Sequence, residues 1–334
     1  MKKTGQSAGP VVAVDIGGTK IMTAIFSADG KMQAKDVRPT LAGEGLNPVI
    51  ERLSSAIESL LFSNSLKPSQ LGAIGIACAG GIDTGRGVVV TPSPHLSGWD
   101  NLPLADIIKK KFGADTYLVN DASAAALGEQ RFGVGKGVKN LVLLTLGTGI
   151  GGGIIADGKL YLGARGGAGE IGHMTVEAHG PECGCGNIGC LEILASGTAI
   201  AGDAIVRVRN GEKSSLVAMA GGDINKITAE TVGNAARNGD KLAQDVITRA
   251  AFYLGVGMVN IVNIFNPEMV VIGGSMAELG EMIIGPGRKM VAAQAFSISA
   301  QAVRIVVAQL GNEAGVYGAA AFALDKVRCI NEST

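Results

Sequence analysis

The chain carries one structural pattern twice, and this duplication is the strongest constraint on its fold. Within residues 11–31, a short apolar run leads through a glycine turn into a second apolar run and an Asp-Gly turn. Residues 141–159 repeat this order, and the tetrapeptide Ala-Asp-Gly-Lys occurs in both copies, at Ala28–Lys31 and Ala156–Lys159. Short apolar runs bounded by turn residues indicate buried strands. We therefore predict an internally duplicated protein with one β-meander in each half.

The rest of the pattern predicts an α/β protein. At 334 residues the chain is longer than one hydrophobic core usually serves, so two domains are expected. Between and after the two copies, apolar strand-like runs alternate with helix-like segments, the longest of which is 241–265. Glycine and polar residues indicate a surface loop at 214–226, and a helix is expected at 286–295. These elements place the chain in the α/β class with mixed sheets.

The charge balance and hydropathy argue against two classes of partner. The 29 basic and 29 acidic residues give no net charge, which is unlike a nucleic-acid-binding protein. The N-terminus lacks the pattern of a secretory signal. The most apolar helical segment, 250–265, is too short to span a bilayer and contains Asn260 and Asn263. We expect a cytoplasmic protein with no nucleic-acid and no membrane partner.

A group of metal-binding residue types lies between Glu170 and Glu192. This segment supplies one imidazole and three thiols, from His173, Cys183, Cys185 and Cys190. Structural zinc sites are closed tetrahedral sets of such ligands and leave no position for a substrate. The sequence therefore predicts a structural zinc ion that fixes this loop. The alternatives are an ordinary reduced loop or a disulfide framework, which the few cysteines and the short Cys183–Cys185 step disfavour.

Three glycine turns follow predicted strands. Each turn presents backbone N–H groups, which form anion-binding concavities, and threonine hydroxyls add further donors. The expected ligand is a polyphosphate chain, whereas a single turn of this kind is ordinarily only a hairpin connection. The three turns are Gly17-Gly18-Thr19, Gly147-Thr148-Gly149 and Gly273-Gly274.

One candidate catalytic carboxylate follows the strand predicted at 116–119. Asn120 and Asp121 stand between that strand and the next helix, where an aspartate commonly serves as the N-cap. Alternatively, Asp121 is a general base, because phosphoryl transfer needs a group that accepts the hydroxyl proton, together with Mg²⁺. The local pattern alone favours the cap.

Together, these motifs resemble the ROK family (repressors, open reading frames, kinases). They occur in the family's order across most of the chain, and the cysteine motif preceded by Glu-Ile-Gly-His is the most specific of them. The motifs are Asp15-Ile-Gly-Gly-Thr-Lys20, Asn120-Asp121-Ala122, Leu146-Gly-Thr-Gly149, Ala168-Gly-Glu-Ile-Gly-His173 and Cys183-Gly-Cys-Gly-Asn-Ile-Gly-Cys-Leu-Glu192.

The resemblance implies a fold and a domain organisation. The family has the actin-like, hexokinase-type (ribonuclease H-like) fold, in which two duplicated α/β domains surround a cleft. The domains would be 1–120 and 121–312, with the zinc loop 173–190 in the second. A final helix at 313–330 would pack back on the first domain. Family members are usually dimers or tetramers, so a homodimer or homotetramer is expected.

The resemblance also implies a role for each motif. Asp121 would be the catalytic base on the sugar 6-hydroxyl, which overrides the local preference for a cap, and Asp15 would order Mg²⁺. His173 would offer one nitrogen to zinc and the other to the sugar. The sugar-binding residues would be Asn120, Asp121, Glu170, His173 and Glu192. The ATP-binding residues would be Asp15, Gly17, Gly18, Thr19, Lys20, Gly147, Thr148, Gly149, Gly273 and Gly274.

The activity so implied is that of an ATP-dependent hexose kinase. Glucose is the expected sugar, because the segment around Trp99 resembles glucokinase-like members, although His95 stands where these often carry asparagine. Kinases for N-acetylmannosamine, N-acetylglucosamine, fructose or allose share the motifs, and polyphosphate is an alternative donor. A non-catalytic sugar sensor is the alternative from another class. A repressor is disfavoured, since the phosphate turn follows residue 15 and leaves no room for a helix-turn-helix.

Overall fold

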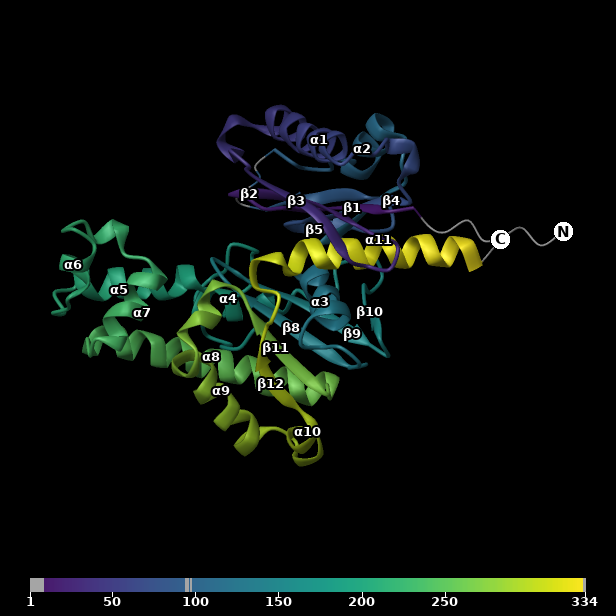
Figure 1. The fold of residues 1–334 in the computed structure, drawn as a ribbon. Helices are drawn as coiled ribbons and strands as arrows, with labels where there is room; N and C mark the ends of the chain where they lie inside the picture. Colours follow the sequence, from purple (N-terminus) through teal and green to yellow (C-terminus); the bar gives the residue numbers. More distant parts are fainter. Residues whose placement is uncertain (1–8, 94–95, 97, 333–334) are drawn as a thin grey trace. The chain divides into compact units, whose positions relative to one another are not determined.

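The structure, a computed structural model, describes residues 9–93, 96 and 98–332 (Figure 1). The chain divides into two compact units. The first comprises residues 1–137, 153–169 and 309–334, and the second comprises residues 138–152 and 170–308. These units group residues by proximity, so the domain boundaries expected at 1–120 and 121–312 stay a prediction. His95 lies outside the described residues.

The first unit is built on a five-stranded sheet with the strand order β3-β2-β1-β4-β7. The strands β1, β2 and β3 form an antiparallel meander, and β4 and β7 continue the sheet in parallel with β1. The carboxyl ends of β1, β4 and β7 therefore meet at one edge. The strand bounds are β1 Val11–Ile16, β2 Lys20–Phe26, β3 Met32–Pro39, β4 Ala73–Cys78 and β7 Thr116–Asn120.

Helices cover both faces of this sheet (Figure 1). Apolar residues of α1 and α2 form one core with the sheet, and α11 packs against β1 and β4 on the opposite face. Helix α11 also lies against α3, where a Cβ added to Gly318 would collide with the carbonyl of Ala124. The helices are α1 Leu46–Ser63, α2 Leu104–Phe112, α3 Asp121–Phe132 and α11 Ala314–Glu332, and a hairpin joins β5 Gly80–Asp83 to β6 Val88–Pro92.

A second five-stranded sheet has the order β10-β9-β8-β11-β12. It repeats the first sheet, because three consecutive strands are followed by two that run parallel to the first of them. The predicted duplication is thus confirmed at the level of topology. Strand β9 crosses the boundary between the two units. The bounds are β8 Leu141–Leu146, β9 Ile150–Ala156, β10 Lys159–Leu160, β11 Met269–Gly273 and β12 Arg304–Val307.

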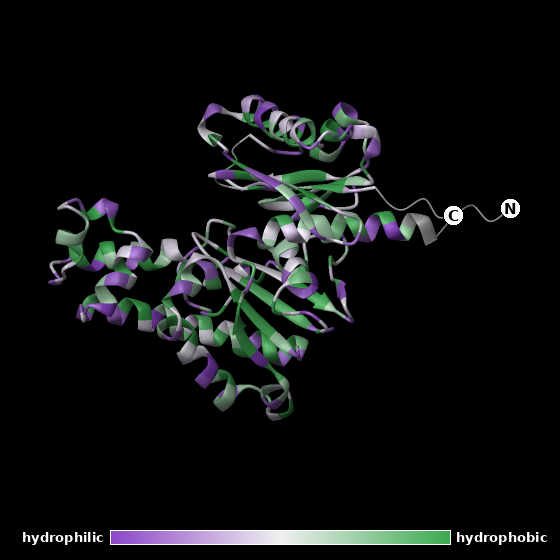
Figure 2. Ribbon diagram, in the orientation of Figure 1, coloured by the Kyte–Doolittle hydropathy of each residue, from purple (hydrophilic) through white to green (hydrophobic). Residues whose placement is uncertain are grey.

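Helix α8, Lys241–Phe265, has the bounds that the sequence predicted. The side chain of Asp240 caps its N-terminus by accepting from the Ala243 N–H, and Asn266 ends it with a φ of 44°. By length and composition α8 could cross a membrane, but more than half of its most apolar stretch is buried inside the protein. It packs against α4, α5, α7 and α9, so it is a core helix. Figure 2 shows most sheet strands as hydrophobic and the helices as mixed.

Two predicted elements differ from the structure. The segment expected to be a loop at 214–226 contains a helical turn, α6, anchored by the fully buried Leu216. The helix expected from residue 286 begins at Glu281, so Pro286 lies inside α9. The remaining helices of the second unit are α4 Leu191–Ala195, α5 Gly197–Arg209, α6 Leu216–Met219, α7 Ala229–Arg237, α9 Glu281–Gln294 and α10 Ser297–Ala302. Short 3₁₀ segments are η1 Ala42–Glu44, η2 Pro68–Gln70, η3 Ile171–His173, η4 Ile224–Lys226, η5 Ser275–Leu279 and η6 Gly311–Glu313.

Candidate functional site

The first group of candidate residues lies at the carboxyl edge of the first sheet. Strand β1 carries Asp15 at its end, and β7 ends at Asn120, immediately before Asp121. Both strands flank β4, whose Ala77 is paired with Asp15 on one side and with Val119 on the other. The charge of Asp121 therefore acts on Asp15. Ligands of open α/β sheets bind outside such strand ends.

The N-cap of α3 is Asn120 and not Asp121. Its Oδ1 accepts from the N–H groups of Ala122 and Ser123 at 3.0 and 3.1 Å, and its Nδ2 donates to the Gly80 carbonyl at 3.1 Å. Asp121 is the first helical residue, and its Oδ1 accepts from the Ala122 N–H at 2.9 Å. The cap that the local pattern favoured for Asp121 is thus wrong, because the neighbouring amide fills that position.

Burial shifts the protonation of both carboxyl groups, although each residue keeps some exposed surface. Desolvation, and then the charge of Asp121, raises the pKa of Asp15 from 3.8 to about 7, against an opposing effect of Lys20. Desolvation also raises the pKa of Asp121, opposed by hydrogen bonds from the backbone and from Asn120. A carboxylate with a raised pKa is a suitable proton acceptor near neutral pH. A hard oxygen donor such as Asp15 also suits Mg²⁺, whose charge would favour the ionised form.

The raised pKa of Asp15 predicts that Asp15→Asn stabilises the protein increasingly as the pH rises. The folded chain keeps this proton up to about pH 7, whereas an unfolded chain releases it near 3.8. Between these values the unfolded state binds fewer protons, so the free energy of unfolding of the wild type falls with rising pH. Asparagine removes this loss, which amounts to at most about 4 kcal/mol. Urea unfolding without Mg²⁺ or nucleotide, at about pH 5 and about pH 8, measures the difference.

The control for this experiment is Asp106→Asn. Asp106 is exposed in the first turn of α2, so the control makes the same replacement of a carboxyl by an amide and leaves Asp15 in place. This variant is expected to keep the pH dependence of the wild type. Identical pH profiles for the wild type and Asp15→Asn would contradict the raised pKa.

The turn Gly17-Gly18-Thr19 connects β1 to β2. The Gly17 N–H donates to the carbonyl of Lys20 at 3.1 Å and closes the turn. Lys20 Nζ donates to the carbonyl of Asn312 at 3.1 Å, so this cation lies beside the segment that precedes α11. The predicted residues 17–20 therefore form one contiguous turn next to Asp15. Their role in binding phosphate stays a prediction.

The turn Gly147-Thr148-Gly149 occupies the corresponding position between β8 and β9. The Gly147 N–H donates to the carbonyl of Gly149 at 2.9 Å. The neighbouring strand β11 ends at Gly273, and Gly274 follows with a φ of 84°. A Cβ at this position would collide with the carbonyl of Leu146, so only glycine fits. The structure thus brings Gly273-Gly274 next to the turn 147–149.

The polar residues that flank the cysteines have different neighbours. Glu192 lies in the first turn of α4, and its Oε2 accepts from the Ile150 N–H at 2.8 Å, directly beside Gly149. Glu170 precedes the 3₁₀ turn η3, and its carbonyl accepts from the His173 N–H at 3.1 Å. The structure therefore joins Glu192 to the glycine turn and Glu170 to His173. Sugar binding by these three residues stays a prediction.

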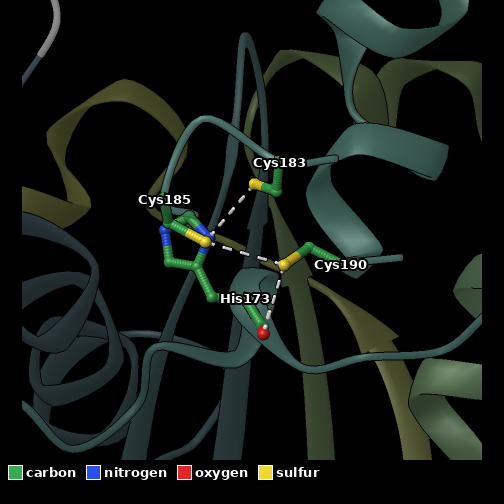
Figure 3. A group of neighbouring side chains, drawn as sticks. All are labelled: His173, Cys183, Cys185 and Cys190. Carbon is green, nitrogen blue, oxygen red and sulfur yellow. Dashed lines mark hydrogen bonds between the residues drawn. The ribbon is translucent and has the colours of Figure 1, made fainter. Parts of the chain in front are cut away.

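His173 and three cysteines converge on one point (Figure 3). One ligand atom from each residue lies within 4.8 Å of the others. Nδ1 of His173 faces Sγ of Cys183 at 3.8 Å, and the Sγ atoms of Cys185 and Cys190 are 3.7 Å apart. Cys183 and Cys190 are buried, whereas Cys185 is exposed.

The spacing within this cluster fits a tetrahedral zinc site. Two thiolates bound at about 2.3 Å to one zinc ion stand about 3.8 Å apart. That value matches the separation of Cys185 and Cys190, whereas a disulfide would need about 2 Å. None of the three cysteines forms a disulfide, so the disulfide alternative is not supported. The cluster is consistent with zinc binding.

Two threonines that contact the glycine turns were not among the predicted site residues. Thr40 Oγ1 donates to the carbonyl of Gly17, and Thr198 Oγ1 donates to the carbonyl of Thr148. Each threonine is distant in sequence from its turn, by 23 and 50 residues respectively. No local pattern connects them with these turns, so sequence reasoning had no signal for either contact.

Comparisons with known proteins identify related chains. The family model of the ROK family matches residues 11–326. The chain is 38% identical to the glucokinase of Thermotoga maritima, over 95% of this chain and 98% of that protein. It is 32% identical to the xylose repressor of Caldicellulosiruptor bescii, over 96% of this chain and 80% of the repressor. Both a kinase and a repressor are therefore among its relatives.

A solved structure supports the same comparison. A ROK family glucokinase from Streptomyces griseus, in complex with glucose and AMPPNP, superimposes with a TM-score of 0.80. The two chains are 33% identical, and the match covers 95% of this chain and 100% of that one. This likeness, with the two five-stranded mixed sheets, confirms the predicted actin-like, hexokinase-type fold.

Proposed function

The chain belongs to the ROK family, and on that basis we propose that it is an ATP-dependent hexose kinase. It would transfer the γ-phosphoryl group of ATP to the 6-hydroxyl of the sugar, with glucose as the preferred substrate. The observation that carries this proposal is the carboxylate of Asp121, held at the edge where three parallel strands end, with a raised pKa. Relatives named glucokinase support glucose as the sugar.

The proposed reaction is a direct displacement at phosphorus. Asp121 accepts the proton of the 6-hydroxyl as the sugar oxygen bonds to the γ-phosphorus, and the bond to the β-phosphate oxygen breaks. The helix bond from the Ala122 N–H to Oδ1 fixes the orientation of this carboxylate. The two glycine turns and Lys20 bind the phosphates through N–H groups and charge. After this step the proton is on Asp121, the phosphoryl group is on the sugar oxygen, and ADP is the leaving group.

Two metal ions belong to the proposal. Mg²⁺ bound with ATP supplies positive charge to the phosphates, and Asp15 is the residue that would hold it. A zinc ion would be held by His173, Cys183, Cys185 and Cys190, whose spacing fits a closed structural site. Its effect would be to fix the loop between Glu170 and Glu192.

The sugar hydroxyls would be bound by several polar side chains. A site that pairs each hydroxyl of a pyranose rejects analogues that lack one, because its own polar groups then stay unpaired. We further propose that the enzyme is cytoplasmic and acts as a homodimer or homotetramer. The proposed sugar ligands are Asn120, Asp121, Glu170, His173 and Glu192.

A sugar sensor without catalytic activity is the second candidate. The specific observation in its favour is the 32% identity to a xylose repressor over nearly the whole of this chain. Such a protein would bind a sugar and would have no requirement for a proton acceptor at position 121.

A phosphorylation assay over a panel of sugars tests the proposal. ATP with Mg²⁺ is supplied as donor, with polyphosphate in a parallel series, and glucose is compared with N-acetylmannosamine, N-acetylglucosamine, fructose, allose and xylose. Rapid turnover of glucose with ATP is the expected result. Preference for another sugar would keep the kinase and replace the substrate. Sugar binding by calorimetry without turnover by any donor would refute the kinase and leave the sensor.

A further inference from the structure

In both the turn 17–19 and the turn 147–149, a threonine from another segment donates hydrogen bonds to carbonyl groups of the turn. A glycine-rich turn has much conformational freedom, so its N–H groups face a ligand only if the peptide planes are fixed. Fixing requires partners for the turn carbonyls, which point away from the N–H groups of the same peptides. The structure supplies such partners for each turn separately, and in each unit a threonine provides two of them.

Thr40 holds the first turn. Its Oγ1 donates to the carbonyl of Gly17 at 2.6 Å, and its N–H donates to the carbonyl of Thr19 at 2.9 Å. Thr40 is fully buried, and its own carbonyl accepts from Arg52 of α1 at 2.7 Å. Arg52 also donates to the carboxylate of Glu44 at 2.6 Å, which fixes its guanidinium group. The side chain of Arg52 thus links Thr40, and through it the glycine turn, to helix α1.

Thr198 holds the second turn. Its Oγ1 and its N–H both donate to the carbonyl of Thr148, at 2.8 and 3.3 Å. The preceding Gly197 N–H donates to the carbonyl of Gly147 at 2.8 Å. Both residues stand in the first turn of α5, whose N–H groups have no partner within the helix. The N-terminus of α5 therefore binds the carbonyl oxygens of Gly147 and Thr148.

We infer that Thr40 and Thr198 are positioning residues for the phosphate groups of the nucleotide. Their hydroxyl groups keep the turns 17–19 and 147–149 in the conformation that directs N–H groups to phosphate oxygens. Such preorganisation strengthens binding because the ordering is complete before the ligand arrives. This inference rests on the proposed function, since it assumes that the turns bind the phosphates of ATP.

The test replaces each hydroxyl by a methyl group of equal size. Thr40→Val and Thr198→Val are expected to raise the KM for ATP roughly fivefold each, the effect of one hydrogen bond. The KM for the sugar is expected to stay within about twofold of the wild-type value. The serine variants Thr40→Ser and Thr198→Ser keep the hydroxyl and are expected to restore the KM for ATP.

Two matched controls separate positioning from general stability. Thr116 is a buried threonine of the first unit whose Oγ1 donates to the Ala114 carbonyl, and Thr248 is an exposed one of α8 that donates to Gln244. Thr116→Val and Thr248→Val lose an equivalent bond away from the turns and are expected to leave the KM for ATP unchanged. If Thr40→Val does not fold, the exposed Thr198 still tests the inference.

A binding measurement keeps this test separate from that of the proposed function. Calorimetric affinity for AMPPNP with Mg²⁺ is compared between the wild type and the valine variants, and it requires no turnover. Weaker AMPPNP binding by the valine variants supports the inference even if no sugar is phosphorylated. The inference is overturned if the valine variants match their controls, if serine does not restore binding, or if the wild type does not bind AMPPNP.

Discussion

Asp121→Asn is expected to lower the rate of sugar phosphorylation by about 10²- to 10⁴-fold while sugar binding persists. Asparagine keeps the size of the side chain and an oxygen that accepts from the Ala122 N–H. It cannot accept the proton of the 6-hydroxyl, so only the chemical step is lost. The wild-type rate is also expected to fall when the pH is lowered and Asp121 becomes protonated. Because burial raises the pKa of Asp121, this fall should begin at a higher pH than for a solvent-exposed aspartate. Steady-state rates and sugar affinity by calorimetry measure these effects.

The matched control for Asp121→Asn is Asp83→Asn. Asp83 also lies in the first unit, and its Oδ1 accepts from a backbone N–H, that of Arg86 at 3.0 Å. The control therefore repeats the change of charge and the kept hydrogen bond at a position without a proposed catalytic role. A variant at position 121 that retains the wild-type rate would refute the assignment of the base.

Replacement of Cys190, one of the four proposed zinc ligands, is expected to have the largest effect on stability. Structural zinc sites in peptides contribute roughly 10–16 kcal/mol of apparent binding energy, part of which is folding energy. Cys190→Ser replaces a fully buried thiol immediately before α4, so we expect loss of bound zinc and a strongly lowered melting temperature. Activity is expected to fall as well, because Glu192 of α4 binds the Ile150 N–H beside the glycine turn.

Zinc content per chain and thermal unfolding with and without chelator measure this prediction. The control is Cys329→Ser, since Cys329 is an exposed cysteine of α11 outside the cluster. That variant is expected to keep both the metal and the melting temperature. A wild-type protein that contains no zinc and whose melting temperature responds to neither chelator nor added zinc would contradict the site.

The sequence was sufficient for the duplicated sheets because their signals are local. The apolar runs and turns within 11–31 and 141–159 indicate the two meanders directly, and β1 and β8 are their first strands. The helix predicted at 286–295 starts too late because proline is favoured at the first position of a helix, whereas Gly280 is the N-cap of α9 and Glu281 its first residue. The helix within 214–226 was missed because its anchor is the burial of one residue, Leu216.

In the candidate site, too, the features with a local sequence signal were predicted and those that depend on tertiary packing were not. The glycine turns and the cysteine cluster are short motifs, and the structure holds the four metal-ligand candidates together as predicted. The choice between Asn120 and Asp121 as the cap could not be made from sequence, because both residue types are favoured at that position. Thr40 and Thr198 could not be found at all, since their contacts depend on tertiary packing.

The first unit combines the N-terminal part of the chain with its C-terminal helix, and this has a consequence for synthesis on the ribosome. Domains generally fold as they emerge, with the N-terminal one first. Here the N-terminal sheet receives α11 only when residues 314–332 have been made, and until then the faces of β1 and β4 that α11 covers lack their partner. The second unit is complete at residue 308. The part of the protein that is translated first is therefore the part that is finished last.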